Sequence, residues 1–397
     1  MKGSVRKVAV LGSTGSVGTQ ALDVIRAQEG LSLCALSAKN NVEEAEKQIR
    51  AFSPAFAAMA DPRAAAELML RVADTGTRVF AGREGIAEMI ASCGADVYLN
   101  SVLGFEGLFS TREIIKTGKP LALSNKESIV TAGELVKKAA KRSGTEILPV
   151  DSEHCAIHQC LRVGEHGEIK KLLLTASGGP FYGYSPRELE KVTLEETLAH
   201  PTWKMGKKIT VDSATLMNKG FEVIEASRLF DVPGEKIEVL VHRESIVHSA
   251  VEYADHAILA QLSLPDMRFC AQYALTYPCR LPGPTEELSL AEIGSLSFAR
   301  PDLTAFPLLA LAYRALSDGG IYPAVLNAAN EEAVHAFLDK KIRYPEIAEV
   351  VTAVYEETPP LGVPLTFKQI YQADAEARLA AGERVRRIEI QERKLSR

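Results

Sequence analysis

The stretch K-V-A-V-L-G-S-T-G-S-V-G, residues 7–18, decides the fold of the N-terminal part of the chain. Its apolar run, Lys7–Leu11, predicts a buried strand, and the residues after the last glycine keep a helical period as far as Ala27. Glycines at such a turn let the backbone bend tightly and approach a pyrophosphate at the N-terminus of the helix. The spacing is GxxGxxG rather than the GxGxxG of the common dinucleotide signature, so a plain tight turn is the alternative interpretation.

A second predicted strand, Leu31–Ser37, is followed by Ala38-Lys39-Asn40, about twenty residues beyond the last glycine. At this place an acidic residue usually binds the ribose of NAD, whereas a basic residue accommodates the 2′-phosphate of NADP. Lys39 therefore favours NADP over NAD. The alternative is that Lys39 is only a solvated residue at a strand end.

Apolar runs and helical periods alternate up to residue 150, which predicts a doubly wound, Rossmann-like α/β domain over residues 1–150. The further strands are predicted at 55–60, 78–81, 96–102, 120–124 and 146–150. Ligands of such domains bind outside the carboxyl ends of the strands. Three polar clusters follow successive strands there: Asn100-Ser101, Ser124-Asn125-Lys126-Glu127 and Asp151-Ser152-Glu153.

Asp151 and Glu153 stand on either side of Ser152 where a helix is predicted to begin. Two carboxylates this close repel each other unless a cation shares them or one is protonated. Together with Glu222 they form an all-oxygen set suited to a hard divalent ion such as Mg²⁺ or Mn²⁺, with Co²⁺ as a third candidate. An acidic helix N-terminus is the alternative. His154 and His158 imitate a zinc pair, but no third ligand supports one, so they are interpreted as packing residues.

The stretch from His200 to Glu225 begins with a loop that holds the only tryptophan of the chain, Trp203. His200, Trp203 and Met205 alternate there with a proline and with Gly206, a composition typical of a mobile lid. A short β-like run, Lys208–Val211, is predicted next.

After this run a helix is predicted, with Asp212 or Ser213 as its N-cap. Asn218, Lys219 and Glu222 then share one face near the start of the helix, where the dipole and the unbonded N–H groups favour a phosphate. An ordinary solvated helix face is the alternative interpretation.

The middle of the chain predicts an α+β domain over residues 151–275. Its strands are expected at 171–176, 237–241, 245–253 and 257–263, and the last two alternate in hydrophobicity like an antiparallel hairpin. Ser177-Gly178-Gly179-Pro180 forms a turn that could hold a phosphate oxygen. Residues 276–302 resemble a linker, and residues 303–397 predict a helical bundle with helices at 308–317, 324–340, 347–356 and 367–381, followed by a charged tail.

Length and composition narrow the class of protein. The chain has 397 residues, 46% hydrophobic and 24% charged, which is typical of a globular protein. A net charge of −5 argues against a broad nucleic-acid surface. The six cysteines lack CxxC pairs, and no apolar run approaches ~18 residues, so we expect a cytoplasmic protein without disulfides, a zinc knuckle or a membrane span.

Taken together, these residues resemble the 1-deoxy-D-xylulose 5-phosphate reductoisomerase family over essentially the whole chain. The most specific motifs are G-S-T-G-S-V-G at 12–18, S-N-K-E-S at 124–128, P-V-D-S-E-H at 149–154, A-S-G-G-P-F at 176–181, the stretch 200–226, L-A-Q-L-S-L-P-D-M-R at 259–268 and P-A-V-L-N-A-A-N-E-E-A-V at 323–334.

The resemblance implies roles for individual residues. It implies a divalent cation on Asp151, Glu153 and Glu222, and among the catalytic residues also Lys126 and His200. It implies that substrate is bound by Lys126, Ser152, Glu153, Ser177, His200, Trp203, Met205, Ser213, Asn218, Lys219 and Glu222, with the phosphate among Ser177, Ser213, Asn218 and Lys219. It implies that NADPH lies along Thr14, Gly15, Ser16, Val17, Ala38, Lys39, Asn40, Asn125, Glu127 and Gly206.

The implied reaction is a retro-aldol and aldol rearrangement of 1-deoxy-D-xylulose 5-phosphate, followed by hydride transfer from NADPH to give 2-C-methyl-D-erythritol 4-phosphate for non-mevalonate isoprenoid biosynthesis. A homodimer is also implied. Two other functions are weighed against this one: an NADP-linked aldehyde reductase that needs no metal, and a non-catalytic NADPH-binding protein. The three carboxylates argue against the first, and turnover of any kind would exclude the second.

The chain departs from the family pattern in three places. Ala38 replaces a glycine near the expected adenosine ribose, where it could tune the affinity for NADPH. His242-Arg243-Glu244-Ser245 stands where H-P-Q-S is typical, and Phe269-Cys270 stands where a small residue and proline are common. The last two departures are predicted to lie away from the chemistry.

Overall fold

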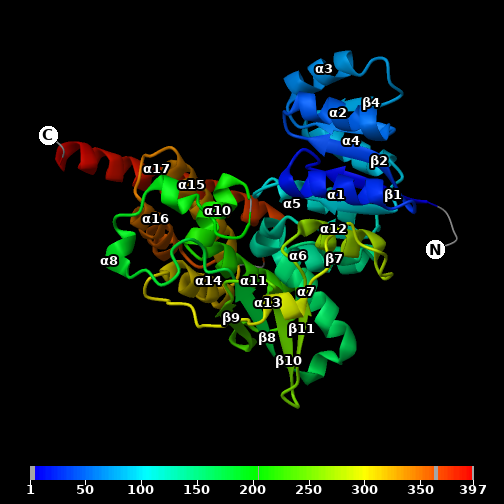
Figure 1. Cartoon of the computed structure of the whole chain (residues 1–397). Helices are drawn as coiled ribbons and strands as arrows, with labels where there is room; N and C mark the ends of the chain where they lie inside the picture. The colour runs from blue at the N-terminus through cyan, green and yellow to red at the C-terminus, as the bar shows by residue number, and fades with distance from the viewer. Residues whose placement is uncertain (1–4, 204, 362–364, 396–397) are drawn as a thin grey trace. The chain divides into compact units, whose positions relative to one another are not determined.

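The computed structural model describes residues 5–203, 205–361 and 365–395 (Figure 1). The chain divides into two compact units. The first unit comprises Met1–Ser128, Val136–Cys155 and Asp266–Glu287, and the second comprises Ile129–Leu135, Ala156–Pro265 and Leu288–Arg397. The division into domains at residues 150, 275 and 302 stays a prediction.

A parallel sheet of seven strands forms the centre of the first unit, in the order β4-β3-β2-β1-β5-β6-β7. Its strands are β1 (Arg6–Leu11), β2 (Leu31–Ala38), β3 (Phe56–Met59), β4 (Arg78–Ala81), β5 (Val97–Asn100), β6 (Leu121–Leu123) and β7 (Ile147–Pro149). The strand order reverses between β1 and β5, and this switch point is where doubly wound sheets bind their ligands. The predicted Rossmann-like fold is confirmed.

The helices of this unit follow the strands in β/α alternation: α1 (Ser16–Ala27), α2 (Val42–Phe52), α3 (Pro62–Arg71), α4 (Gly82–Ser92) and α5 (Gly107–Ile115). α6 (Lys126–Ser143) and α7 (Ser152–Cys160) contribute residues to both units. From much later in the chain, α12 (Met267–Thr276) packs against α1, and its residues Ala271, Ala274 and Leu275 are buried in the same core as Val8 and Val10. The side chain of Arg6 in β1 also holds α12 in the first unit, because it donates to the Leu275 carbonyl oxygen at 2.8 Å.

The second unit contains a mixed sheet in the order β11-β10-β8-β9. Its strands are β8 (Ile169–Ala176), β9 (Ile237–Val241), β10 (Val247–Tyr253) and β11 (Ile258–Leu262). β8 and β9 are parallel, whereas β10 is antiparallel to both β8 and β11. The predicted hairpin of the last two strands is therefore confirmed.

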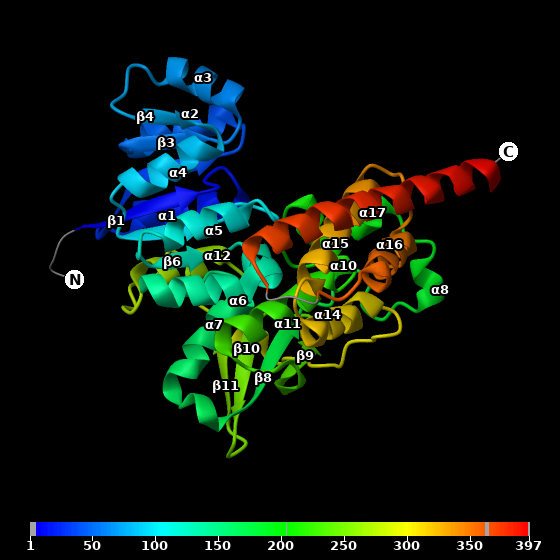
Figure 2. The same ribbon diagram turned by 180° about the vertical axis from the view of Figure 1, so that it is seen from behind.

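Helices make up the rest of the second unit: α8 (Pro186–Leu189), α9 (Leu194–Thr197), α10 (Lys207–Ala214), α11 (Met217–Phe230), α13 (Leu290–Ile293), α14 (Pro307–Asp318), α15 (Tyr322–Leu338), α16 (Tyr344–Glu357) and α17 (Phe367–Leu395), with 3₁₀ turns at Leu161–Val163, His166–Glu168 and Gly234–Lys236. The helices α14 to α17 confirm the predicted helical bundle, and α17 packs along α15 (Figure 2). Apolar residues of α11, β8 and β10 share one core with those of α14 to α17.

Two local predictions are wrong. The run Lys208–Val211 is not a strand but part of α10, because Val211 and Ala214 bury one face of a helix that packs against α15. Asp212 and Ser213 lie in the last turn of α10 and cap no helix; α11 begins after Leu216, which has a left-handed backbone with φ 57°.

The charged tail is also helical rather than a loose end. The helix predicted to stop at residue 381 continues as α17 to Leu395. Ala373, Ala377, Ala381 and Val385 keep one buried face along it. Within the described part of the chain, none of the helices combines the length and the apolar character needed to cross a bilayer.

The close packing of Gly18 leads to a first prediction. A Cβ at Gly18 would lie 2.2 Å from the Gly12 carbonyl oxygen and 2.6 Å from Ser13 Cα, both backbone atoms that cannot swing away. We expect Gly18→Ala to destabilise the first unit by about 2 kcal/mol and to weaken NADPH binding at least about tenfold. Thermal unfolding and NADPH titration measure both effects. Gly76→Ala is the matched control, since its Cβ would meet nothing within 4 Å, and equal behaviour of the two variants would contradict the expectation.

Candidate active site

The glycine loop lies at the switch point of the first unit. The backbone N–H groups of Gly12 and Ser13 both donate to the Ser37 carbonyl oxygen at 2.9 Å, which ties the loop to the end of β2. A Cβ at Gly12 would lie 2.7 Å from the Ser101 carbonyl oxygen, so the backbones of two neighbouring connections approach closely. Gly15 is the N-cap of α1 and provides no side-chain cap. The loop thus offers a helix N-terminus framed by glycines, which fits a pyrophosphate.

The other predicted cofactor residues of the first unit lie at neighbouring strand ends. Thr14, Ser16 and Val17 belong to the loop and the first turn of α1; Ala38 is buried at the end of β2, and Lys39 and Asn40 after it are exposed. Asn125 and Glu127 lie at the start of α6, where Asn125 Nδ2 donates to the carbonyl oxygens of Val102 and Gly104 at 2.7 and 2.9 Å and to Glu127 Oε2 at 3.0 Å. Asn125 thus holds the loop that follows β5, and Glu127 accepts from the same amide group.

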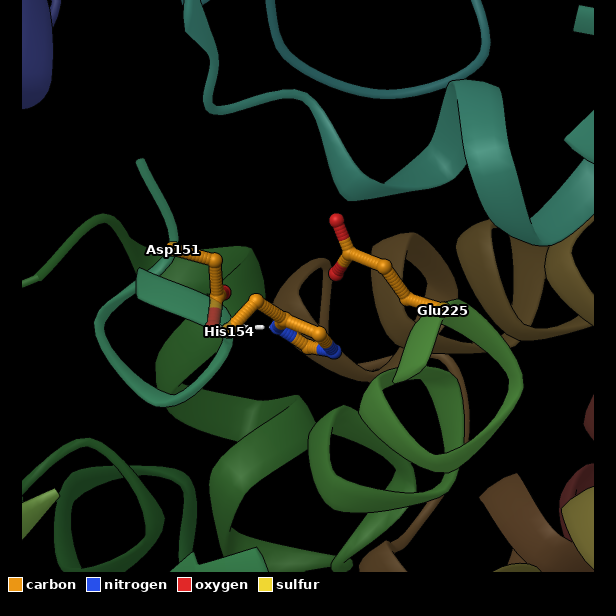
Figure 3. A group of neighbouring side chains, drawn as sticks. All are labelled: Asp151, His154 and Glu225. Carbon is orange, nitrogen blue, oxygen red and sulfur yellow. Dashed lines mark hydrogen bonds and ion pairs between the residues drawn. The ribbon is translucent and has the colours of Figure 1, made fainter. Parts of the chain in front are cut away.

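The carboxylate of Asp151 in the first unit is contacted by a lysine and by a histidine. It is buried, and its Oδ2 lies 2.7 Å from Lys126 Nζ. Its Oδ1 lies 2.9 Å from His154 Nδ1, the contact drawn as a dashed line in Figure 3. Burial alone would raise the pKa of Asp151, but the charge of Lys126 and the bond to His154 hold that pKa well below its ordinary value. The carboxylate is therefore ionised and compensated by an ammonium group.

Ser152 and Glu153 occupy the first turn of α7. Ser152 Oγ donates to Glu153 Oε2 at 2.6 Å, and Glu153 is half-buried whereas Ser152 is buried. With Asp151 this turn offers two carboxylates and one hydroxyl. Carboxylate and hydroxyl oxygens are the ligands that hard cations prefer.

Glu222 is the matching carboxylate of the second unit. It lies on α11 with 1% of its surface exposed, and both of its oxygens are engaged. Lys219, one turn earlier and also buried, forms an ion pair with Oε2, and Asn218 Nδ2 donates to Oε1. The predicted face of Asn218, Lys219 and Glu222 is thus present; Lys219 and Glu222 are buried, and Asn218 is half-buried.

His200 joins two serines that come from separate segments of the second unit. Its Nε2 lies 3.0 Å from Ser177 Oγ, after β8, and 3.1 Å from Ser213 Oγ, in α10. The backbone N–H groups of Thr202 and Trp203 donate to Nδ1 at 3.2 and 2.9 Å. Nδ1 is therefore an acceptor, and the proton of the neutral ring sits on Nε2, where it can donate to a serine or to an anion. Burial, and then the charge of Arg243, lower the pKa of His200 to about 4, which keeps the ring neutral.

Trp203, Met205 and Gly206, which are predicted to form a lid with His200, follow it in the sequence. Trp203 and Met205 are half-buried, and Gly206 is the N-cap of α10. The ring centroid of Trp203 lies 6.1 Å from that of His248 on β10. The structure therefore brings His200 into contact with Ser177 and Ser213. It also brings Lys219 and Asn218 into contact with Glu222 on α11. The cofactor roles of single residues stay predictions.

Sequence reasoning misses three residues. His154 is interpreted as a packing residue, yet it holds Asp151; the i, i+3 spacing of the two was the available signal. His248 lies beside Trp203 without any local motif. Arg243 is predicted to lie away from the chemistry, yet its guanidinium donates to the carbonyl oxygens of Ser177 and Gly179 at 2.8 and 2.6 Å, in the turn whose Ser177 contacts His200.

The burial of His248 predicts a pH effect on stability. Burial lowers its pKa from 6.5 to about 4 in the folded state. Between these values the unfolded chain binds a proton that the folded chain does not, so stability is full above pH 6.5 and falls as the pH drops toward 4. The difference corresponds to roughly 3 kcal/mol for this residue.

We expect His248→Gln to flatten this loss between about pH 7 and pH 4.5, measured as the change in free energy of unfolding with urea. His335→Gln, which alters an exposed histidine of α15, is the control and should keep the wild-type slope. An unchanged slope in His248→Gln would show that this histidine does not titrate as described.

Comparisons with known proteins show which protein family the chain matches. A family model described as 1-deoxy-D-xylulose 5-phosphate reductoisomerase matches residues 8–133. The model of the C-terminal domain of that enzyme matches residues 147–230, and a further model, the DXP reductoisomerase C-terminal domain, matches residues 262–380.

Individual relatives agree with these models. The chain is 48% identical to the 1-deoxy-D-xylulose 5-phosphate reductoisomerase of Chlorobium phaeobacteroides, over 94% of this chain and 97% of that protein. It is 49% identical to that of Geobacillus kaustophilus, over 94% and 98%. Among solved structures, the enzyme of Zymomonas mobilis in complex with NADPH superposes with a TM-score of 0.90 at 41% identity, over 96% of this chain and 99% of that one.

A second solved structure, DOX-P reductoisomerase in complex with NADPH, fosmidomycin and magnesium, has a TM-score of 0.90 at 38% identity, over 96% of this chain and 98% of that one. Both solved structures match nearly the full length of the chain. Their sequence identities of 41% and 38% are far above the identities at which two proteins share only a fold. The chain belongs to the 1-deoxy-D-xylulose 5-phosphate reductoisomerase family.

Proposed function

We propose that the chain converts 1-deoxy-D-xylulose 5-phosphate to 2-C-methyl-D-erythritol 4-phosphate with NADPH and a divalent cation, as an oxidoreductase of the non-mevalonate isoprenoid pathway. The observation that carries the proposal is the pairing of buried carboxylates with lysines: Asp151 with Lys126 in the first unit and Glu222 with Lys219 in the second. Family membership supports the reaction, and the complexes of relatives with NADPH and magnesium support the cofactors.

The donor set fits a divalent cation. Asp151, Glu153 and Glu222 each offer a carboxylate oxygen that could hold a metal ion, and together they form an all-oxygen donor set. We assign the cation to these three residues, with Mg²⁺ or Mn²⁺ as the expected ion and Co²⁺ as a third candidate. When bound, the cation supplies Lewis-acid activation of the carbonyl and hydroxyl oxygens of the substrate during the retro-aldol and aldol rearrangement.

The residues of the second unit would bind the phosphate end of the substrate. We assign this role to Ser177, Ser213, Asn218 and Lys219, with His200 donating from Nε2. Lys219 supplies a positive charge in a buried place, where it attracts a dianion more strongly than it would in water. His200, Trp203 and Met205 would close over the substrate and exclude water, so that binding energy from the phosphate serves the reaction at the distant carbons.

The first unit would bind NADPH along the glycine loop. We assign the pyrophosphate to Thr14, Gly15, Ser16 and Val17 at the N-terminus of α1, and the 2′-phosphate side to Ala38, Lys39 and Asn40. Asn125 and Glu127, and Gly206 of the second unit, complete the assigned set. Lys126 and Ser152, beside Glu153, would face the substrate from the first unit.

The test is an assay of NADPH oxidation with 1-deoxy-D-xylulose 5-phosphate, with the product identified by mass and NMR spectra. We expect stoichiometric 2-C-methyl-D-erythritol 4-phosphate, and a strong preference for NADPH over NADH because of Lys39. Oxidation that yields a simple reduced ketose, without rearrangement of the carbon skeleton, would identify an ordinary aldehyde or ketone reductase instead.

We further propose a homodimer in the cytoplasm. The six cysteines are thiols rather than disulfides, and five of them are buried, which suits a reducing compartment. Light scattering during size-exclusion chromatography should give twice the mass of the chain, and a mass equal to one chain would contradict the dimer.

A further inference from the structure

The turn that follows β8 is held by a side chain from the connection between β9 and β10. Arg243 Nη1 donates to the carbonyl oxygen of Ser177 at 2.8 Å and to that of Gly179 at 2.6 Å. The guanidinium carbon also lies 5.4 Å from the centre of the Tyr182 ring, within the range of a cation–π contact. One guanidinium group thus holds both ends of the turn Ser177-Gly178-Gly179.

This turn depends on an unusual backbone. Gly178 and Gly179 have φ of +77° and +64°, and a Cβ at Gly179 would lie 2.8 Å from the Ser213 carbonyl oxygen. The turn therefore passes very close to α10, and its two outer carbonyl oxygens are directed to Arg243. Ser177 Oγ is left beside His200 Nε2 at 3.0 Å, among the residues assigned to the phosphate.

Arg243 itself projects from a rigid connection. His242 before it is buried, and its Nε2 accepts from the backbone N–H groups of Ile246 and Val247 at 3.1 and 3.0 Å. Its Nδ1 donates to the Ser297 carbonyl oxygen at 2.9 Å, and its ring stacks on Phe298 with centroids 4.7 Å apart. The backbone immediately before Arg243 is therefore held in place by these contacts of His242.

The charge of Arg243 reaches the same cluster. The two acceptors of Nη1 are neutral carbonyl oxygens, so these hydrogen bonds do not compensate the positive charge of the guanidinium. After burial, this charge is the second cause that lowers the pKa of His200. The same positive charge would stabilise a dianion bound beside His200.

We propose that Arg243 is a positioning residue for the substrate phosphate, which it serves by fixing the Ser177–Gly179 turn and by adding positive charge beside it. The inference rests on the proposed function, because it presupposes that this turn binds phosphate. It concerns Arg243 of this chain, which stands where the resemblance to the family leads us to expect proline.

The test compares Arg243→Met, Arg243→Lys and the wild type, with Arg187→Met as control for an exposed arginine of α8 in the same unit. Inorganic phosphate is titrated while the fluorescence of Trp203, the only tryptophan, is followed. Steady-state kinetics with 1-deoxy-D-xylulose 5-phosphate then give kcat and KM. Thermal unfolding of each variant confirms that it is folded.

We expect Arg243→Met to bind inorganic phosphate about tenfold more weakly and to raise the KM for substrate by a similar factor, while kcat changes less than about twofold. Arg243→Lys should fall between Arg243→Met and the wild type, because it keeps the charge but not the bonds to both carbonyls. A phosphate affinity and KM of Arg243→Met equal to those of Arg187→Met would overturn the inference, as would a loss confined to kcat. A wild type that neither binds phosphate nor oxidises NADPH would instead overturn the proposed function.

Discussion

Replacing Glu222 by glutamine is expected to lower kcat/KM for 1-deoxy-D-xylulose 5-phosphate about a thousandfold. Glutamine keeps the shape of the side chain and can still accept from Asn218, but it removes the negative charge. The cation would lose one of its three assigned carboxylates, and Lys219 would lose its ion-pair partner. Metal activation of this kind is worth several kcal/mol in the transition state, and each 1.36 kcal/mol is tenfold in rate.

The effect on metal binding separates this explanation from general damage. Titration with Mn²⁺, followed by its paramagnetic resonance signal, should show weaker binding by Glu222→Gln, whereas NADPH binding by the first unit should be unchanged. Glu235→Gln alters an exposed carboxylate of the same unit and should behave as wild type. Full activity of Glu222→Gln with unchanged metal affinity would remove Glu222 from the proposed metal site.

The largest expected effect on stability comes from Asp212. This carboxylate has 1% of its surface exposed; Asn330 Nδ2 donates to its Oδ1 at 2.7 Å, and Lys208 Nζ lies 2.8 Å from its Oδ2. Asp212→Ala would take away the acceptor of Asn330, which is buried in α15, and the counter-charge of Lys208. Removing one partner of a buried ion pair typically costs about 3 to 5 kcal/mol. Because 24% of the Lys208 side chain is exposed, we expect the lower end of this range here, about 3 kcal/mol.

Urea unfolding followed by Trp203 fluorescence measures this loss in the second unit. Asp212→Asn should cost less, because an amide oxygen can still accept from Asn330. Glu349→Ala, on the exposed side of α16, is the control and should change the free energy of unfolding by no more than about 0.5 kcal/mol. A loss of that small size in Asp212→Ala would mean that the connection between α10 and α15 contributes little to stability.

The parallel sheet could be predicted from the sequence because its buried strands are apolar runs bounded by glycines and polar clusters. The run 31–37, for example, becomes β2 (Leu31–Ala38), and the run 78–81 becomes β4 with the same bounds. The run 208–211 could not be assigned in this way, because its alternating Ile209 and Val211 fit a strand as well as a helix. Packing of α10 against α15, more than a hundred residues away, decides the outcome.

In the candidate site, too, contacts between residues close in sequence could be predicted, whereas contacts between distant segments could not. Lys219 and Glu222 share a helix face and could be paired from their spacing alone. The contact of Arg243 with the Ser177 carbonyl oxygen joins residues 66 positions apart, across two strands whose register the sequence does not reveal. His200 between two serines likewise depends on how three segments of the second unit meet.

The most direct test of the central claim is NADPH oxidation by wild-type protein stripped of metal with EDTA, with 1-deoxy-D-xylulose 5-phosphate as substrate. We predict no oxidation above background until Mg²⁺ or Mn²⁺ is added back, and then formation of 2-C-methyl-D-erythritol 4-phosphate. NADPH binding should persist throughout, which shows that the protein is folded. Oxidation that proceeds at the full rate in EDTA would contradict a metal-dependent reductoisomerase.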